Sequence, residues 1–380
     1  MTDLLRTRTA TTPAMLAVFD DDATIAHALA FEGALARAQA TEGIISEELA
    51  SAIVDACITI AIDPAALAEE SALAGTLAIP LVARLRASLS GDVRAAVHKG
   101  ATSQDVADTV LMMQTRAAAK LVLTDLDRIV HALSRVALRH AETPAVGRTL
   151  LQDALPVAFG LRIAHWMVGV ADAVQRLRRD VEDHALIQLG GAAGARAGLD
   201  GAGLAIASHM ANELGLAVSE PWHARRVGIA AVGTSLAVAI GAIGKMARDV
   251  ALLSQNTVAE AREPAIAGRG GSSAMAHKRN PTGCQIALSA ALRAPGLAAT
   301  LLAGLPQEEE RGLGGWQAEG PVLADLFLLA AGAADAMATV AEGLEIDEVA
   351  IARNLANAGI GTDIGESATI VRALAAGREG

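Results

Sequence analysis

The chain has 380 residues, of which 52% are hydrophobic and only 2% aromatic, and its formal net charge is −11 at pH 7. Such a length can bury a large core and is ordinarily divided into two or more domains, while the acidic balance argues against a nucleic-acid or anionic-membrane partner. With Cys57 and Cys284 as its only cysteines, the chain implies no disulfide framework. Because the first residues also lack the apolar core of a signal peptide, we expect a cytoplasmic protein.

Short helices separated by polar breaks are predicted over roughly the first hundred residues. One helix is expected over residues 31–40, and another begins at Asp63-Pro64 because proline suits the first turn of a helix. Residues 75–80 and 90–92 are expected to be loops. This region is therefore predicted to form an N-terminal helical domain over residues 1–100.

Long helices are predicted after Gly100, because apolar residues such as Leu126, Ile129, Val130 and Leu133 follow the three-and-four spacing of one helical face. No strand-like alternation is evident, so the predicted fold class is all-α. We expect about five long helices in an elongated bundle over residues 101–342, and a short helical appendage over residues 343–380. The expected spans are 105–140, 156–185, 221–258, a helix that follows Pro281 and is interrupted at Pro295, and 322–341.

One helix in this bundle has no charged residue over residues 227–244, which is about the length needed to cross a bilayer. Charged residues flank it closely at both ends. We expect instead a helix that is buried on all sides within the bundle. Helices this apolar also favour coverage by partner subunits.

Polar stretches that interrupt the apolar helices are the candidates for chemistry. The first, His98-Lys99-Gly100-Ala101-Thr102-Ser103-Gln104-Asp105, has capping-box spacing between Thr102 and Asp105 and so marks a helix N-terminus, which can receive an anion. A purely structural cap explains Thr102 and Asp105 equally well but leaves His98 and Lys99 unexplained. The second, residues 147–156, offers Thr149 and Gln152 as donors to a carboxylate, or simply to loop backbone.

The third stretch, residues 268–281, combines glycines, hydroxyls and cations in one loop: Gly268-Arg269-Gly270-Gly271-Ser272-Ser273-Ala274-Met275-Ala276-His277-Lys278-Arg279-Asn280-Pro281. Glycines allow close approach to a ligand, and a loop of this kind can close over an anion. A solvated basic turn is the structural alternative.

Taken together, these stretches resemble the signatures of the fumarase/aspartase superfamily, in its order and at its spacing. The third resembles G-S-S-x-M-P-x-K-x-N-P and the first H-x-G-x-T-S-x-D. Within the superfamily the resemblance is strongest to the cycloisomerases of carboxylated muconates. It extends over nearly the whole chain, from Met15 to about Glu345, with supporting stretches at residues 190–194, 221–223 and 310–319.

Several positions depart from the superfamily pattern. The histidine that its lyases carry after the threonine of the second stretch is replaced by Leu150. Ala276 stands where the third signature usually has its first proline, and Arg226 stands where an acidic residue is expected after Arg225. Leu150 suits a substrate carboxylate, which attacks or leaves without a proton partner, better than it suits an amine.

The resemblance implies the closure of a lactone on 3-carboxy-cis,cis-muconate, in protocatechuate breakdown through the beta-ketoadipate pathway. Ser273 matches the superfamily's base and would act here as general acid, with Lys278 and Asn280 stabilising charge on a carboxylate. His98 is expected to bind a substrate carboxylate or orient a donor, although a structural histidine is the alternative. The implied catalytic residues are Ser273, Lys278 and His98, and the implied substrate-binding residues are Thr102, Ser103, Thr149, Gln152, Asn280, Arg279, Arg225 and Arg311.

The resemblance further implies a small tricarboxylate substrate and a homotetramer whose active sites are shared between subunits. No cofactor and no metal are expected, since the sequence contains no metal-ligand cluster or phosphate-binding glycine motif. Two alternatives stay open: a lyase that releases fumarate from adenylosuccinate or argininosuccinate, and a non-catalytic protein that retains the helical scaffold. His223 and His277 are weaker candidates, and Arg279, Arg225 and Arg311 could be ordinary surface ion-pair partners.

Overall fold

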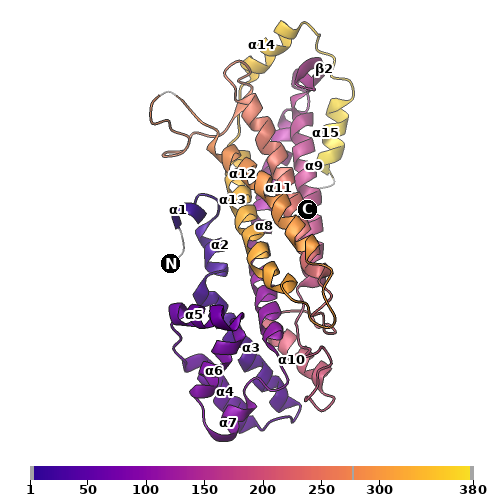
Figure 1. The fold of residues 1–380 in the computed structure, drawn as a ribbon. Coiled ribbons are helices and arrows are strands. Elements are labelled where there is room, and N and C mark those ends of the chain that lie inside the picture. Colours follow the sequence, from indigo (N-terminus) through magenta and orange to yellow (C-terminus); the bar gives the residue numbers. More distant parts are fainter. Residues whose placement is uncertain (1–3, 276–277, 377–380) are drawn as a thin grey trace.

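The computed structural model of the chain describes residues 4–275 and 278–376. Long helices run side by side along most of the molecule, with short N-terminal helices at one end and a β-hairpin at the other (Figure 1). The predicted all-α fold with an elongated bundle is thereby confirmed. The bundle consists of α8 (Ser103–Arg139), α9 (Phe159–His184), α11 (Val227–Leu253), α12 (Thr282–Ala303) and α13 (Gly315–Glu342).

The helices of the bundle alternate in direction. Arg226, just before α11, donates to Asp108 near the start of α8 and to Glu319 near the start of α13, so these three helices begin at the same end. We call this end the lower end, as it is drawn in Figure 1, and the opposite end the upper end. α8 packs against α9 and α13, and α12 packs against α11 and α13. With 37 residues, α8 is about 55 Å long and spans the distance between the two ends.

A β-hairpin at the upper end corrects one prediction. β1 (Pro144–Thr149) and β2 (Gln152–Ala158) are antiparallel, with Thr149 opposite Gln152, and Pro156 lies in β2 instead of beginning a helix. The strands have only six and seven residues and bury few side chains, so they show no clear period-two pattern in the sequence.

Proline positions account for two further differences. α12 continues through Pro295, and α13 begins before Pro321 and includes it. Pro295 lies on the exposed side of α12, where water can satisfy the carbonyl that loses its helical partner. A proline within an apolar run therefore indicates the end of a helix less reliably in this chain than expected.

Short helices of the N-terminal region lie beside the lower half of the bundle (Figure 1). They enclose a small core of their own, which includes Ala36, Ile53, Leu85 and Val97. The division into three domains stays a prediction. The helices are α1 (Leu4–Thr7), α2 (Pro13–Val18), α3 (Asp21–Thr41), α4 (Glu47–Thr59), α5 (Pro64–Ala74), α6 (Ala78–Ala87) and α7 (Gly91–Ala96).

The remaining elements connect the bundle helices or follow them. β3 pairs with β4 antiparallel, which ties the chain after α11 to the chain after α13. α14 packs against β1, and α15 packs against α8 and α9. These elements are α10 (Gly203–Leu214), β3 (Ala261–Arg262), β4 (Glu345–Ile346), α14 (Glu348–Ala358) and α15 (Ser367–Ala376).

α11, α12 and α13 have the length and apolar composition that a membrane span needs. α11 packs against α9, α12 and α13, which agrees with a helix of the bundle. The expectation that it is buried on all sides is wrong, however, because Val227 and Val238 are 65% and 45% exposed. One apolar face of the bundle is thus left uncovered in the single chain.

Candidate active site

At the lower end, the first polar stretch meets the loop between α12 and α13. Arg311 donates through Nη1 to Thr102 Oγ1 at 2.8 Å and through Nη2 to Ser103 Oγ at 2.7 Å. Its guanidinium also lies 5.8 Å from the ring centroid of Trp316. Because the arginine occupies a lone pair on each oxygen, both hydroxyl protons stay free to donate to a bound carboxylate. The structure therefore brings three predicted binding residues together.

His98 belongs to the same end and forms a carboxylate–imidazole pair. Its Nδ1 lies 2.6 Å from Glu32 Oε1, with the Glu32 side chain buried and the His98 side chain 14% exposed. Such a carboxylate holds the proton on Nδ1 and leaves Nε2 for another partner. The backbone of His98 is left-handed, with φ of 60°, which is uncommon for residues other than glycine. Lys99 is exposed beside it, with Nζ 3.3 Å from the carbonyl oxygen of Ile44.

Asp105 fixes the backbone of this stretch. Its carboxylate accepts hydrogen bonds from the backbone N–H groups of Thr102 (2.9 Å), Gly190 (2.8 Å) and Gly191 (2.9 Å). It also lies 2.8 Å from Nε2 of His223, which is only 3% exposed. A Cβ on Gly191 would sit 2.9 Å from the carbonyl oxygen of Gly100, so only glycine fits there. The capping role predicted for Asp105 is confirmed, and His223 is structural.

Arg226, one of the departures noted above, lies in a buried charge cluster. It pairs with Asp108 and Glu319, and its guanidinium lies 4.7 Å from the ring centroid of Trp222. Burial opposes its charge, yet the two carboxylates outweigh burial and raise the pKa of Arg226. Burial in turn raises the pKa of Glu319 despite this arginine. The cluster joins the second turns of α8 and α13 to the residue just before α11.

Arg225 points elsewhere. This exposed residue donates to the carbonyl oxygens of Glu220 and Pro221, each at 3.1 Å. Its predicted role as a substrate cation stays a prediction.

At the upper end, the hairpin presents Thr149 and Gln152 opposite each other, and both are exposed. The stem of the hairpin is held from below by Glu260, whose side chain is fully buried. Arg148 donates to both of its oxygens, at 2.9 and 2.6 Å, and Asn354 of α14 donates to it at 2.8 Å. The hydrogen bonds to Glu260 raise the pKa of Arg148.

The third stretch lies at the same end. Ser273 is exposed, while Lys278, Arg279 and Asn280 line a cleft of about 990 Å³ together with residues at the end of α11. Asn280 Nδ2 donates to the carbonyl oxygen of Gly271 at 3.1 Å, which closes the base of the loop. Ala276 and His277 lie outside the described residues.

Arg279 has a mainly structural position in this cleft. It donates to Glu345 of β4 at 3.1 Å and to the carbonyl oxygen of Glu263 at 2.6 Å. The hydrogen bond lowers the pKa of Glu345. Glu263 in turn accepts from the N–H groups of Gly283 and Cys284 at 3.0 and 2.7 Å, and so caps α12 directly after the loop.

These residues form two groups at opposite ends of the bundle. The first stretch begins α8, and the hairpin follows the end of α8, about 55 Å away for a helix of 37 residues. One chain therefore cannot bring Thr102 and Ser103 into contact with Thr149, Gln152 or the loop of Ser273. A site that contained both groups would need more than one copy of the chain.

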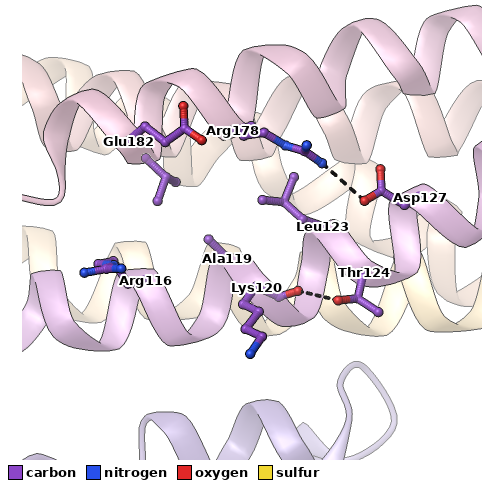
Figure 2. A pocket seen from close by; sticks show the side chains of 9 residues that line it. Arg116, Ala119, Lys120, Leu123, Thr124, Asp127, Arg178 and Glu182 are labelled. Carbon is purple, nitrogen blue, oxygen red and sulfur yellow. Dashed lines mark hydrogen bonds and ion pairs between the residues drawn. The ribbon is translucent and has the colours of Figure 1, made fainter. Parts of the chain in front are cut away.

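Another groove, of about 390 Å³, lies between α8 and α9 (Figure 2). Charges of both signs line it, among them Lys120, Arg116 and Glu182, and Arg178 pairs with Asp127 at 3.2 Å. The groove contains none of the predicted site residues, and its mixed charges do not converge on one ligand. We therefore do not include it in the candidate site.

Sequence reasoning missed the buried acids that hold the site together. Glu32, Glu260 and Glu319 each lie within an otherwise apolar or loop segment and are each almost fully buried. The available signal was a single acidic residue within an apolar run. Such a residue indicates a buried acid, and buried acids are normally paired with a cation or another polar group. The partners could not be read from the sequence because they are 66 to 112 residues away.

Comparison with known proteins places this site in context. Residues 6–296 match the sequence profile of a family described as lyase. The chain is 46% identical over 346 residues to the 3-carboxy-cis,cis-muconate cycloisomerase of Bradyrhizobium diazoefficiens, covering 90% of this chain and 77% of that protein. It is 41% identical over 357 residues to the nitrosuccinate lyase of Streptomyces davaonensis, covering 90% of this chain and 75% of that protein.

A solved structure with the same arrangement is the 3-carboxy-cis,cis-muconate lactonizing enzyme from Pseudomonas putida. Its TM-score is 0.87 at 39% sequence identity, and the match covers 93% of this chain and 79% of that chain.

Proposed function

The chain belongs to the lyase family, and on this premise we propose that it converts 3-carboxy-cis,cis-muconate into 4-carboxymuconolactone. The observation that carries the proposal is the hairpin tip. Thr149 and Gln152 can donate hydrogen bonds to a substrate carboxylate, and Leu150 lies beside them at the tip. A lyase that releases an amine would need a proton-exchanging side chain at this position, but Leu150 is 96% exposed and has no ionisable group. A reaction in which a carboxylate is the nucleophile needs no such group.

Each part of the proposed site has a place in this reaction. A carboxylate oxygen of the substrate forms a C–O bond to one carbon of the neighbouring double bond, and the electron pair moves into the adjacent carboxylate. Lys278 and Asn280, beside the cleft, are suited to stabilise the charge that develops there. Ser273 then delivers a proton to the carbon that carried the electron pair, so that the product is an isomer of the substrate.

The other carboxylates of the substrate need separate binding groups. The hydroxyls of Thr102 and Ser103, held by Arg311, suit one of them, with His98 beside them. Because these groups lie at the lower end and Ser273 at the upper end, we propose that the active site is assembled between copies of the chain, in a homotetramer. A chain with only two cysteines suits a reducing compartment, which supports a cytoplasmic location. Neither a nucleic acid nor a membrane is proposed as a partner.

A pair of ultraviolet assays on the purified protein tests the proposal. Incubation with 3-carboxy-cis,cis-muconate should remove the absorbance of the conjugated diene, and Ser273→Ala should abolish that change. Adenylosuccinate and nitrosuccinate serve as the competing substrates. Fumarate release from either, with an inert diene, would favour a lyase reaction and overturn the proposal.

A further inference from the structure

A cavity of about 480 Å³ lies where the N-terminal helices meet the bundle. Its walls come from α8 and α13 on one side, and from the end of α2, from α3 and from the residues that lead into α6 on the other. Most of the lining is apolar and includes Leu77, Val106 and Val110. The proposed carboxylate-binding hydroxyls of Thr102 and Ser103 do not line it. The cavity is thus separate from that part of the candidate site.

The aromatic residues of this cavity stand out in a chain that is poor in aromatic residues. The chain has four phenylalanines, three tryptophans and no tyrosine. Five of these are buried, namely Phe31, Phe159, Trp166, Trp222 and Phe327. The other two, Phe19 and Trp316, are partly exposed, and both line this cavity. Partly exposed aromatic side chains in an apolar hollow are typical of small-molecule sites, because they can stack against a flat apolar ligand.

Two residues that line the cavity offer hydrogen-bond acceptors. Gln114 is only 6% exposed, and its Nε2 donates to the carbonyl oxygen of Val18 and to Thr24 Oγ1, each at 3.0 Å. Because a carbonyl oxygen can only accept, these contacts fix the orientation of the amide, and its Oε1 accepts no hydrogen bond from the described residues. Pro321 has no N–H, so the carbonyl of Gln317 loses its helical donor. A ligand that donates hydrogen bonds would satisfy these acceptors.

The charges around the cavity argue against a carboxylate ligand. Neither a lysine nor an arginine is among the described residues that line it. Its one acid, Asp108, accepts from Arg226 at 2.8 and 2.7 Å and from Gln188 at 3.0 Å. A polyanion would lose its hydration here without gaining a cation as partner. The cavity therefore suits an uncharged ligand, which differs from the substrate proposed above.

We propose that this cavity binds an uncharged aromatic compound with a hydroxyl donor, as in a phenol. The ring stacks against Phe19 and Trp316, and the hydroxyl donates to Oε1 of Gln114. Trp316 is also the residue whose ring centroid lies 5.8 Å from the guanidinium of Arg311. The ligand thus contacts the same tryptophan as the arginine that holds the carboxylate-binding hydroxyls. This site does not depend on the proposed function.

Fluorine NMR tests the site without requiring any turnover. The probe is 4-fluorophenol, which is uncharged at pH 7, and the broadening of its resonance by the purified protein gives a dissociation constant. We expect saturable binding that is at least tenfold tighter than that of fluorobenzene, which has no donor, and of 4-fluorobenzoate, which is an anion. A lack of saturable binding would overturn the proposal. Equal binding of fluorobenzene would contradict the role of the acceptors, and equal binding of the benzoate would contradict the exclusion of anions.

A cavity-filling variant locates the bound probe. Ala324 of α13 lines the cavity, so Ala324→Phe places a ring in the space of the ligand. We expect the affinity for 4-fluorophenol to fall at least tenfold. The control is Ala117→Phe, at an exposed position of α8 outside the cavity, which should leave the affinity unchanged.

Two outcomes would place the probe elsewhere and overturn the proposal. One is an unchanged affinity in Ala324→Phe, and the other is displacement of the probe by tricarballylate, a tricarboxylate that should bind only at the carboxylate-binding groups. If a thermal melt shows that Ala324→Phe has lost its structure, Leu77→Trp fills the cavity from the opposite wall and takes its place in the test.

Discussion

The two ends of the bundle are built in different ways. At the lower end, the groups that would bind a carboxylate are held in place by other side chains: the buried Asp105 fixes the backbone, the partly buried Arg311 fixes the hydroxyls, and the buried Glu32 fixes the imidazole of His98. At the upper end, Ser273 and the hairpin tip are exposed, and only their bases are anchored, through Glu260 and Glu263. If the two ends form one site between copies, as proposed above, one half of that site is rigid and the other half projects from the bundle.

The largest effect on activity is expected at the exposed end. Ser273→Ala removes the proposed proton donor without disturbing a buried contact, since the serine is exposed. We expect kcat to fall by roughly 10²- to 10⁴-fold, the usual contribution of general acid–base catalysis, with an unchanged melting temperature. Steady-state kinetics on the diene and a thermal melt measure the two quantities. A loss of stability in parallel with activity would show that the side chain of Ser273 makes contacts that hold the upper end together.

The largest effect on stability is expected at the rigid end. Arg226→Met leaves Asp108 and Glu319 as two buried carboxylates without their cation. The free energy of unfolding should fall by about 3–5 kcal/mol, as found when one partner of a buried ion pair is removed. Urea denaturation measures it. Arg225→Met, at the exposed neighbour, is the matched control and should change it by no more than about 0.5 kcal/mol.

A smaller loss of stability is expected below the hairpin. Glu260→Gln keeps the shape of the side chain but removes the charge that Arg148 and the partly buried Arg162 face. We expect the free energy of unfolding to fall by about 1–3 kcal/mol, because the buried hydrogen bonds from Arg148 lose their charged acceptor.

The control for that prediction is Glu345→Gln, at the exposed partner of Arg279. Since the hydrogen bond lowers the pKa of Glu345, the stability it contributes is present above the pKa of glutamate in the unfolded chain. That contribution is lost as the pH falls through the lower pKa of the folded state. We expect Glu345→Gln to lower the free energy of unfolding only slightly near neutral pH, because the pair is exposed, and the difference from the unsubstituted protein to disappear at acid pH. An effect as large as that of Glu260→Gln would contradict the distinction between buried anchor and surface pair.

A smaller effect on activity than that of Ser273→Ala is expected at the proposed carboxylate-binding hydroxyls of the lower end. Arg311→Lys keeps the charge but cannot hold two hydroxyls with one planar group. We expect KM for the diene to rise roughly tenfold, equivalent to one charged hydrogen bond, with kcat changed less. A fall in kcat with unchanged KM would show that Arg311 acts in the chemical step and not in preparing a binding site.

The sequence allowed the helical bundle and the motif residues to be predicted, because both depend on local information. The spacing of Leu126, Ile129 and Leu133 predicts a helix face, and Thr102 with Asp105 predicts where α8 begins. The hairpin was missed because its strands are short, and the proline signals at Pro156 and Pro295 were overridden by packing and exposure. The partners of Glu32 and Glu260 depend on the tertiary fold, so spacing along the chain contains no information about them.

One consequence concerns the length of α8. This helix joins the carboxylate-binding hydroxyls at its start to the hairpin just after its end, with 37 residues between them. Inserting a single residue into a helix advances everything beyond it by about 1.5 Å and turns it by about 100°. In an assembly where each chain supplies its two ends to different active sites, that error would be repeated at every site. The length of α8 thus fixes the distance and the relative orientation of the two ends, so we expect α8 to tolerate insertions and deletions far less than the loops it connects.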